Sequence, residues 1–241
     1  AKKLIWLKKS WNFITPERFN QHISGKYPLK NRSLLLTFDD GYLSGRHIAE
    51  RVLKPLKISA LFFVVSDFID IIDQVESKIY ITQNFYTKKM PLQSQLDENI
   101  QNMTWDDLRY LIYNGHTIGA HTKSHARLSA LKRADLKNEI VFGANILEKK
   151  LNVEINDFAY PFGDLCSFSP LAMRIASERF DHIFTGLRGG NPEGINPLTL
   201  RRDAIMHTDA NYLIGAYLEG GADFLYRPSL NTLESWLPEF P

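Results

Sequence analysis

Apolar residues along the chain fall into short unbroken runs and into longer stretches with helical spacing. The unbroken runs are of the kind that a parallel sheet buries on both faces. On this basis we predict strands at residues 34–38, 60–65, 117–120, 157–160 and 182–185. The spaced stretches predict helices at residues 45–54, 135–151 and 170–179, the first of them ended by Pro55. Strands that alternate with helices are typical of parallel βαβ units.

The segments between these elements are less regular. Residues 104–107 (Thr-Trp-Asp-Asp) are typical of a capping box that opens a helix, and Gly115 should end that helix. Residues 66–103 have no sustained period, and we interpret them as an excursion over one face of the fold. With 241 residues, the chain has the length of one α/β barrel, so we expect a single domain over residues 1–241. A site in such a barrel lies at the C-terminal ends of the strands.

Composition and charge exclude several classes of protein. Twenty-nine basic and 27 acidic residues leave a net charge of +2, which argues against a nucleic-acid binder held by bulk charge. The longest apolar run, residues 60–65, is far shorter than the roughly 20 residues of a membrane helix. Cys166 is the sole cysteine, so no disulfide framework holds the fold.

Polar side chains follow three of the predicted strands. These are Asp39 and Asp40, then His121 and His125, and then the turn at residues 160–163. Two imidazoles and one carboxylate suit zinc or another borderline divalent metal, and three ligands leave a position for water. A second carboxylate beside them can accept a proton from that water. An Asp-Asp-Gly turn or a His-x-x-x-His spacing is weak alone, but their joint placement at strand ends predicts a metal site.

The residues around these side chains resemble a known family. Residues 36–42 (Leu-Thr-Phe-Asp-Asp-Gly-Tyr) and 119–125 (Gly-Ala-His-Thr-Lys-Ser-His) are similar to the first two motifs of polysaccharide deacetylases, the carbohydrate esterase family 4 or NodB homology domain. Residues 158–163 (Phe-Ala-Tyr-Pro-Phe-Gly) resemble the third motif. The resemblance covers residues 33–209. It implies a distorted (β/α) barrel, TIM-barrel-like with fewer than eight regular repeats, that hydrolyses N-acetyl groups of amino sugars in a poly- or oligosaccharide.

The resemblance also implies a role for each matching residue. Asp39 is then the general base, and the metal ligands are Asp40, His121 and His125. The metal is expected to be zinc, although other divalent ions serve in the family. The backbone N–H of Phe162 is expected to face the oxyanion of the tetrahedral intermediate. Four residues are expected to border the substrate: Tyr42, Tyr160, Pro161 and Phe162.

The sequence departs from the family pattern at two places. Where the third motif usually has an arginine that orients the base, this chain has Ala159, so either another arginine replaces it or the base is less well held. We expect Arg202, after the strand-like residues 198–200, to be the substitute. Paired arginines such as Arg201-Arg202 are also common on solvated surfaces. His207, in a stretch that resembles the last motif, is a candidate for the acid that protonates the departing amine. A tryptophan-containing fourth motif has no clear match, and a loop histidine without a catalytic role is the alternative for His207.

Other functions remain open at this stage. The same ligands occur in non-haem iron oxygenases, but Asp39 would then have no task. A glycan-binding module on the same fold that has lost its activity is the main alternative, and the departures above motivate it. The resemblance implies a location outside the cytoplasm, in the cell envelope or periplasm, while a cytoplasmic location stays open. The identity of the glycan and the oligomeric state are beyond what the sequence tells.

Overall fold

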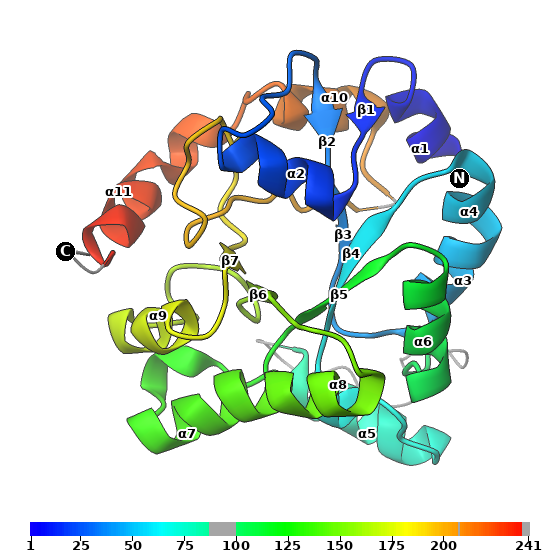
Figure 1. Cartoon of the computed structure of the whole chain (residues 1–241), viewed down its shortest axis with the longest axis vertical. Helices are drawn as coiled ribbons and strands as arrows, with labels where there is room; N and C mark the ends of the chain where they lie inside the picture. Colours follow the sequence, from blue (N-terminus) through cyan, green and yellow to red (C-terminus); the bar gives the residue numbers. More distant parts are fainter. Residues whose placement is uncertain (87–99, 207, 238–241) are drawn as a thin grey trace.

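The computed structural model describes residues 1–86, 100–206 and 208–237. Its centre is a sheet of five parallel strands in the order β3-β4-β5-β6-β7 (Figure 1). The bounds are β3 Leu36–Phe38, β4 Ala60–Val64, β5 Thr117–Ala120, β6 Asp157–Ala159 and β7 His182–Phe184. An isolated parallel bridge between Phe184 and Leu200 continues the sheet beyond β7. The predicted α/β fold with parallel strands, a partial and distorted barrel, is therefore confirmed.

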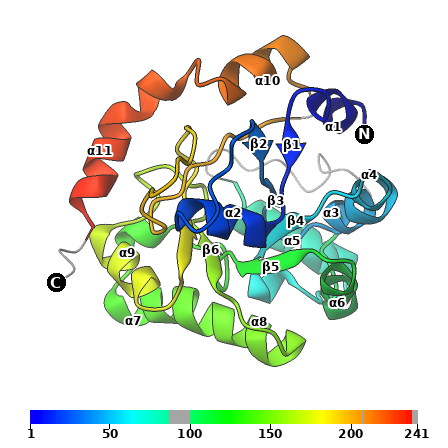
Figure 2. The ribbon, with the colours of Figure 1, turned by 45° about the horizontal axis from the view of Figure 1, so that its top comes forward.

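Helices cover the outer face of this curved sheet (Figures 1 and 2). Those between the strands are α3 Leu43–Ile48, α4 Lys54–Leu56, α5 Gln74–Asn84, α6 Trp105–Tyr113, α7 Arg133–Lys137, α8 Gly143–Leu151 and α9 Pro170–Ser177. After β7 come α10 Asn211–Leu218 and α11 Arg227–Ser235. Within the described residues, no helix has the length and apolar character needed to cross a bilayer.

The two faces of β4 show why its run of apolar residues forms a buried strand. All five of its residues are buried. Phe62 and Val64 pack into the main core beneath the outer helices, whereas Leu61 and Phe63 pack with a second cluster on the inner face. Because side chains alternate between the faces of a strand, an unbroken apolar run is needed where both faces are covered.

The first 34 residues add elements that the pattern of apolar residues did not predict. They form α1 Lys2–Leu7, β1 Asn12–Phe13, α2 Pro16–Ile23 and β2 Ser33–Leu34. β1 and β2 pair in parallel, and Phe19 of α2 packs on the inner cluster of the main sheet. The predicted strand at residues 34–38 is in fact two strands separated at Leu35, because β2 pairs with β1 while β3 pairs with β4.

Two further predictions are wrong in detail. Pro55 does not end its helix, which continues to Leu56 and ends where Lys57 takes a left-handed conformation. A π-helical turn over Ala49–Leu53 precedes this proline and shifts the hydrogen-bond ladder where a proline N–H is missing. The excursion at residues 66–103 contains the regular helix α5, capped by Asp73, while residues 87–99 lie outside the described part.

The remaining helices agree with their predictions. Thr104 and Asp107 form the predicted capping box, with each side chain bonded to the backbone N–H of the other. Gly115 follows this helix with a φ of 81°. The helix predicted at residues 135–151 is continuous from Arg133 to Leu151 and includes one π-helical turn.

Candidate active site

Asp39 and Asp40 come directly after β3, in a turn that only a few residue types can adopt. Asp40 has a φ of 76° and Gly41 a φ of 103°. Glycine suits this φ, and a Cβ at Gly41 would lie 2.9 Å from Cδ1 of Ile69, which would have to move. The carbonyl of Asp40 accepts a hydrogen bond from the N–H of Val65, which fixes the turn to the end of β4.

His121 and His125 follow β5, two strands away from β3. The N–H of His121 donates to the carbonyl of Val64, so His121 begins where the ladder with β4 ends. Thr122 and His125 both have a positive φ, and the Thr122 hydroxyl accepts a hydrogen bond from the N–H of His125 at 2.9 Å. This compact turn places both imidazoles on the side of the sheet edge where Asp40 lies.

The three side chains converge on one point. The Oδ1 atom of Asp40 lies 3.5 Å from Nε2 of His121 and 3.4 Å from Nε2 of His125. One ligand atom from each residue lies within 4.8 Å of the other two, which is compatible with a shared metal ion. Both histidines are almost fully buried, while Asp40 is partly open.

Hydrogen bonds fix the tautomer of both histidines. Nδ1 of His121 lies 2.8 Å from the carbonyl of Ala159, and Nδ1 of His125 lies 2.9 Å from the carbonyl of Asn84. A carbonyl oxygen accepts only, so each Nδ1 carries a proton and donates it. In the neutral ring, Nε2 then carries a lone pair on the side of Asp40. A histidine that binds a metal through Nε2 has this tautomer, with Nδ1–H donating to an outer acceptor.

The pKa values of the site also favour neutral histidines. Burial lowers the pKa of His121, and burial together with the neighbouring His121 lowers the pKa of His125 to about 3. Both rings are therefore neutral near pH 7. Burial, and secondly the carboxylate of Asp39, raises the pKa of Asp40 to about 7. Two nitrogens and one carboxylate oxygen are a donor set that zinc accepts, so the residues fit a divalent metal.

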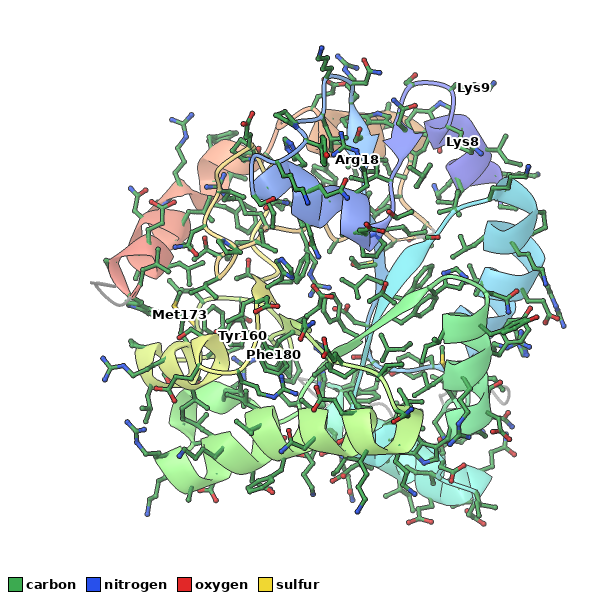
Figure 3. The ribbon with its side chains drawn as sticks, in the orientation of Figure 1. Lys8, Lys9, Arg18, Tyr160, Met173 and Phe180 are labelled. Carbon is green, nitrogen blue, oxygen red and sulfur yellow. The ribbon has the colours of Figure 1, made fainter. Side chains whose placement is uncertain are left out.

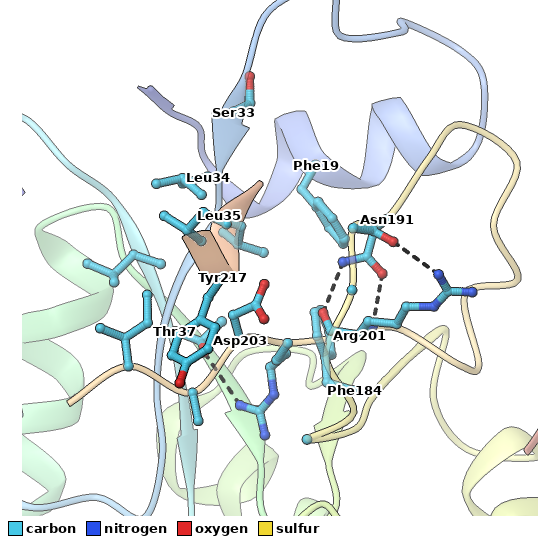
Figure 4. Close-up of a pocket in the computed structure, with 18 of the residues that line it drawn as sticks. Phe19, Ser33, Leu34, Leu35, Thr37, Phe184, Asn191, Arg201, Asp203 and Tyr217 are labelled. Carbon is cyan, nitrogen blue, oxygen red and sulfur yellow. Dashed lines mark hydrogen bonds between the residues drawn. The ribbon is translucent and has the colours of Figure 1, made fainter. Parts of the chain in front are cut away.

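Asp39 lies beside this cluster and binds an arginine. Its carboxylate is 2.6 Å from a terminal guanidinium nitrogen of Arg202 and 4.0 Å from Nε2 of His121. Burial alone would raise the pKa of Asp39, but the positive charge of Arg202 holds it below its usual value. Arg202 is itself held by the carbonyl of Thr185 and the hydroxyl of Thr37, the latter visible at the end of a dashed line in Figure 4.

The turn of the third motif is bound tightly to the next strand. Phe162 has a φ of 63°, and Gly163 lies so close to Gly186 that a Cβ there would come within 2.5 Å of the Gly186 nitrogen. Among the described residues, the N–H of Phe162 donates to no protein acceptor. The ring of Phe162 contacts that of His125, with centroids 4.6 Å apart, and lines the pocket.

Not every expected residue lies in the pocket. Tyr160 is 1% exposed, and its ring stacks on that of Phe168 in the core, with the two ring centroids 3.8 Å apart. Figure 3 shows it near Met173 and Phe180. Neither Tyr160 nor Pro161 lines the pocket, and Tyr42 packs edge-on against aromatic rings behind it. His207 lies outside the described residues.

Phe85 also contributes to the site. Its ring, at the end of α5, has its centroid 4.6 Å from that of His125, and it lines the pocket. The carbonyl that holds His125 comes from Asn84, the residue before it. No local signal in the sequence links Phe85 to a histidine 40 residues later.

A cavity of about 790 Å³ joins these residues. One end contains Asp39, Asp40, His121 and His125, and the walls continue along the residues before β3 and along residues 201–205. Figure 4 shows Ser33, Leu34, Leu35 and Thr37 on one side of this cavity. Such a volume is within the usual range of ligand sites.

Solved structures share this architecture. IcaB from Ammonifex degensii has a TM-score of 0.70 and 23% identity, over 90% of this chain and 87% of that chain. The deacetylase PplD of Streptococcus pyogenes, in complex with acetate, has a TM-score of 0.70 and 19% identity, over 90% and 84%. A de-N-acetylase from Aggregatibacter actinomycetemcomitans has a TM-score of 0.67 and 18% identity, over 88% and 85%. At these identities the likeness shows the fold.

The sequence comparisons give the family itself. No curated protein sequence matches the chain. The family model of polysaccharide deacetylases, however, matches residues 26–177, which is more than half of the chain and includes the turns that hold Asp39, Asp40, His121 and His125. On this match, and with a fold shared with solved deacetylases, the chain belongs to the polysaccharide deacetylase family.

Proposed function

We propose that this protein is a metal-dependent N-deacetylase, which hydrolyses N-acetyl groups of amino sugars in a poly- or oligosaccharide of the cell envelope or an exported glycan. The observation that supports it most directly is the pairing of a complete Asp-His-His ligand set with an arginine-bound second aspartate. A glycan-binding module would not need Asp39 to be kept ionised beside the ligands. Family membership and the shared fold agree with this activity.

In this proposal Asp40, His121 and His125 hold the metal, with zinc as the expected ion. The metal supplies Lewis-acid polarisation of the acetyl carbonyl and lowers the pKa of the attacking water. Asp39 accepts the proton of that water, because Arg202 keeps its carboxylate ionised and oriented.

The remaining steps use the protein around the ligands. The N–H of Phe162, which has no acceptor among the described residues, donates to the oxyanion of the tetrahedral intermediate, in a turn that the close approach of Gly163 to Gly186 holds in place. An amide nitrogen leaves poorly as an anion, so an acid must protonate it, and His207 is our candidate. The products are acetate and a free amino sugar.

The test is acetate release from a panel of N-acetylated glycans, measured before chelation, after it, and after zinc is restored. We expect release that chelation stops and zinc restores, and none from an Asp39→Asn variant that still binds zinc. Binding of a glycan without acetate release, with zinc bound, would favour the inactive binding module instead.

A further inference from the structure

Basic residues are concentrated at the start of the chain. The first 32 residues contain eight lysines and arginines and a single acidic residue, Glu17, although the whole chain has a net charge of only +2. The rest of the molecule is therefore net acidic. A charge division of this kind points to a surface that attracts anions.

Pairing of β1 with β2 brings four of these cations together. Asn12 pairs with Ser33 in a parallel register, so the residues before each strand lie at the same edge. We call the exposed side chains there the basic face, which consists of Lys8, Lys9, Lys30 and Arg32. Figure 3 shows Lys8 and Lys9 at the outer margin of the molecule.

Few carboxylates neutralise the basic face. Arg32 pairs with the half-exposed Glu219, and its guanidinium lies 5.7 Å from the ring of Trp11. Lys8 donates to the carbonyl of Leu56. In the part of the chain that the structure describes, Lys9 and Lys30 have no ion-pair partner. The basic face thus keeps most of its positive charge.

The basic face is joined to the candidate active site by one cavity. Trp11 and Asn31, which lie among the basic residues in the chain, line the same 790 Å³ cavity as Asp39 and His121. The chain from Ser33 to Asp39 is extended, and its six steps span roughly 20 Å at about 3.3 Å per residue. The cavity therefore runs along a considerable length of the sheet edge.

This path follows the open side of the sheet. β3 is an edge strand of the five-stranded sheet, and within the described residues no strand pairs with its free edge. The opposite wall is formed by residues 201–205, and Figure 4 shows Arg201 and Asp203 across from Leu35 and Thr37. An extended ligand fits a cavity of this shape better than a compact one.

We propose that the substrate is an extended N-acetylated glycan that carries anionic groups, such as phosphates, and that lies along this cavity. Its reacting sugar sits at the Asp39–His121 end, and an anionic group of the same chain binds the basic face roughly 20 Å away. The inference rests on the proposed deacetylase function and specifies its substrate class.

An anionic membrane is the other partner that lysines attract, but α1 favours the glycan. Leu4 and Leu7 of α1 pack toward the core, and Ile5 is its one exposed large aliphatic side chain. Little apolar area is left to enter a bilayer. The continuity of Trp11 and Asn31 with the active-site cavity favours a ligand that occupies both.

The experiment compares two matched substrates, a neutral pentamer of N-acetylglucosamine and the same pentamer with a phosphate on either terminal sugar. We expect a KM at least tenfold lower for a phosphorylated pentamer at low ionic strength, with the difference shrinking as salt is added. The double variant Lys9→Glu/Lys30→Glu should abolish this difference and leave kcat/KM for the neutral pentamer unchanged. Lys137→Glu/Lys149→Glu, exposed on α7 and α8, is the matched control and should behave as the wild type.

Equal KM values for the two pentamers, or a preference that survives in Lys9→Glu/Lys30→Glu, would overturn the proposal. Direct binding of the phosphorylated pentamer to the same variants decides the question independently of turnover, so failure of the deacetylase function stays distinguishable. Binding to anionic phospholipid vesicles that the charge reversal removes, without any preference between pentamers, would assign the basic face to a membrane and also overturn it.

Discussion

The contact between Arg202 and Asp39 is the feature of the site that depends most on tertiary structure. The two residues are 163 positions apart, and the guanidinium also binds Thr185 and Thr37. From the sequence, the absence of an arginine at Ala159 left two alternatives, another arginine in its place or a base that is less well held, and the position of Arg202 after a strand-like stretch made it the favoured substitute. Only the folded chain shows that the side chain turns inward to Asp39.

Replacing Arg202 tests whether this contact matters for turnover. We expect Arg202→Ala to lower kcat by about 100-fold, because a base displaced by about 1 Å loses roughly that factor. The guanidinium lowers the pKa of Asp39, so its loss raises that pKa and moves the acid limb of the pH–rate profile to higher pH. Arg202→Lys should keep part of the wild-type kcat and part of the lowering of the Asp39 pKa. An unchanged pH profile in Arg202→Ala would show that Arg202 does not act through Asp39.

Asp40 gives the metal site a specific pH dependence. Its pKa is raised to about 7 by burial and by Asp39, whereas the lowered pKa of each histidine leaves both rings neutral. Below pH 7 a metal must displace the proton of Asp40, so we expect zinc affinity to fall about tenfold per pH unit there and to level off above it. Calorimetry of zinc binding in buffers with different ionisation enthalpies would detect the released proton. Affinity that is constant from pH 5.5 to 7 would contradict this.

Tyr160 shows what the alternation of a strand could have predicted. Ala159 packs on the inner face of the sheet, and Phe158 and Tyr160 pack on the outer face beneath the helices. Since successive side chains of a strand point to opposite faces, only one of two neighbouring residues can face the cavity. The resemblance to a motif suggested that the whole turn borders the substrate. The alternation accounts for Tyr160, which supports the core, whereas Phe162 lines the cavity because it lies in the turn after the strand, with a φ of 63°.

At the scale of elements, the buried strands were predictable and the small N-terminal elements were not. Unbroken apolar runs mark β4 clearly, but a two-residue strand such as β1 has no pattern of its own. α2 did have a local signal, because Thr15 caps it and Pro16 occupies its first turn. The pairing of β1 with β2 depends on residues 21 positions apart, which local patterns do not specify.

The end of α5 contacts the proposed metal ligand His125, and replacing Phe85 tests whether this contact orients the ligand. The ring of Phe85 contacts His125, and the carbonyl of the preceding residue, Asn84, accepts a hydrogen bond from Nδ1–H of His125. We expect Phe85→Ala to lower zinc affinity by about 10- to 100-fold, the usual effect of losing an outer partner of a ligand. Phe85→Leu should restore much of it. Zinc affinity is measured by competition with a chromogenic chelator.

A matched control separates this effect from general loss of packing. Tyr113, at the end of α6, is 89% exposed, and Tyr113→Ala should leave zinc affinity unchanged. If Phe85→Ala binds zinc as tightly as the wild type, α5 does not orient His125, and the contact serves the shape of the cavity alone.

For the molecule as a whole, the ligands bridge strands that the backbone joins only indirectly. Asp40 follows β3 and His121 follows β5, with β4 between them. A bound metal would therefore tie the end of β3 to the end of β5 across β4. Since a ligand that binds only the native state stabilises it, free zinc at 1,000 times its Kd should add about 4 kcal/mol to the free energy of unfolding.

For a chain of this length, that gain should raise the melting temperature by roughly 8–16 °C, because each kcal/mol corresponds to about 2–4 °C. Calorimetric melting with and without zinc measures the shift. The variant His121→Gln/His125→Gln removes two ligands and should lose the response to zinc, although its metal-free melting temperature should stay near that of the metal-free wild type. An equal shift in this variant would place the stabilising zinc at another site, and the strands would then not be tied through Asp40.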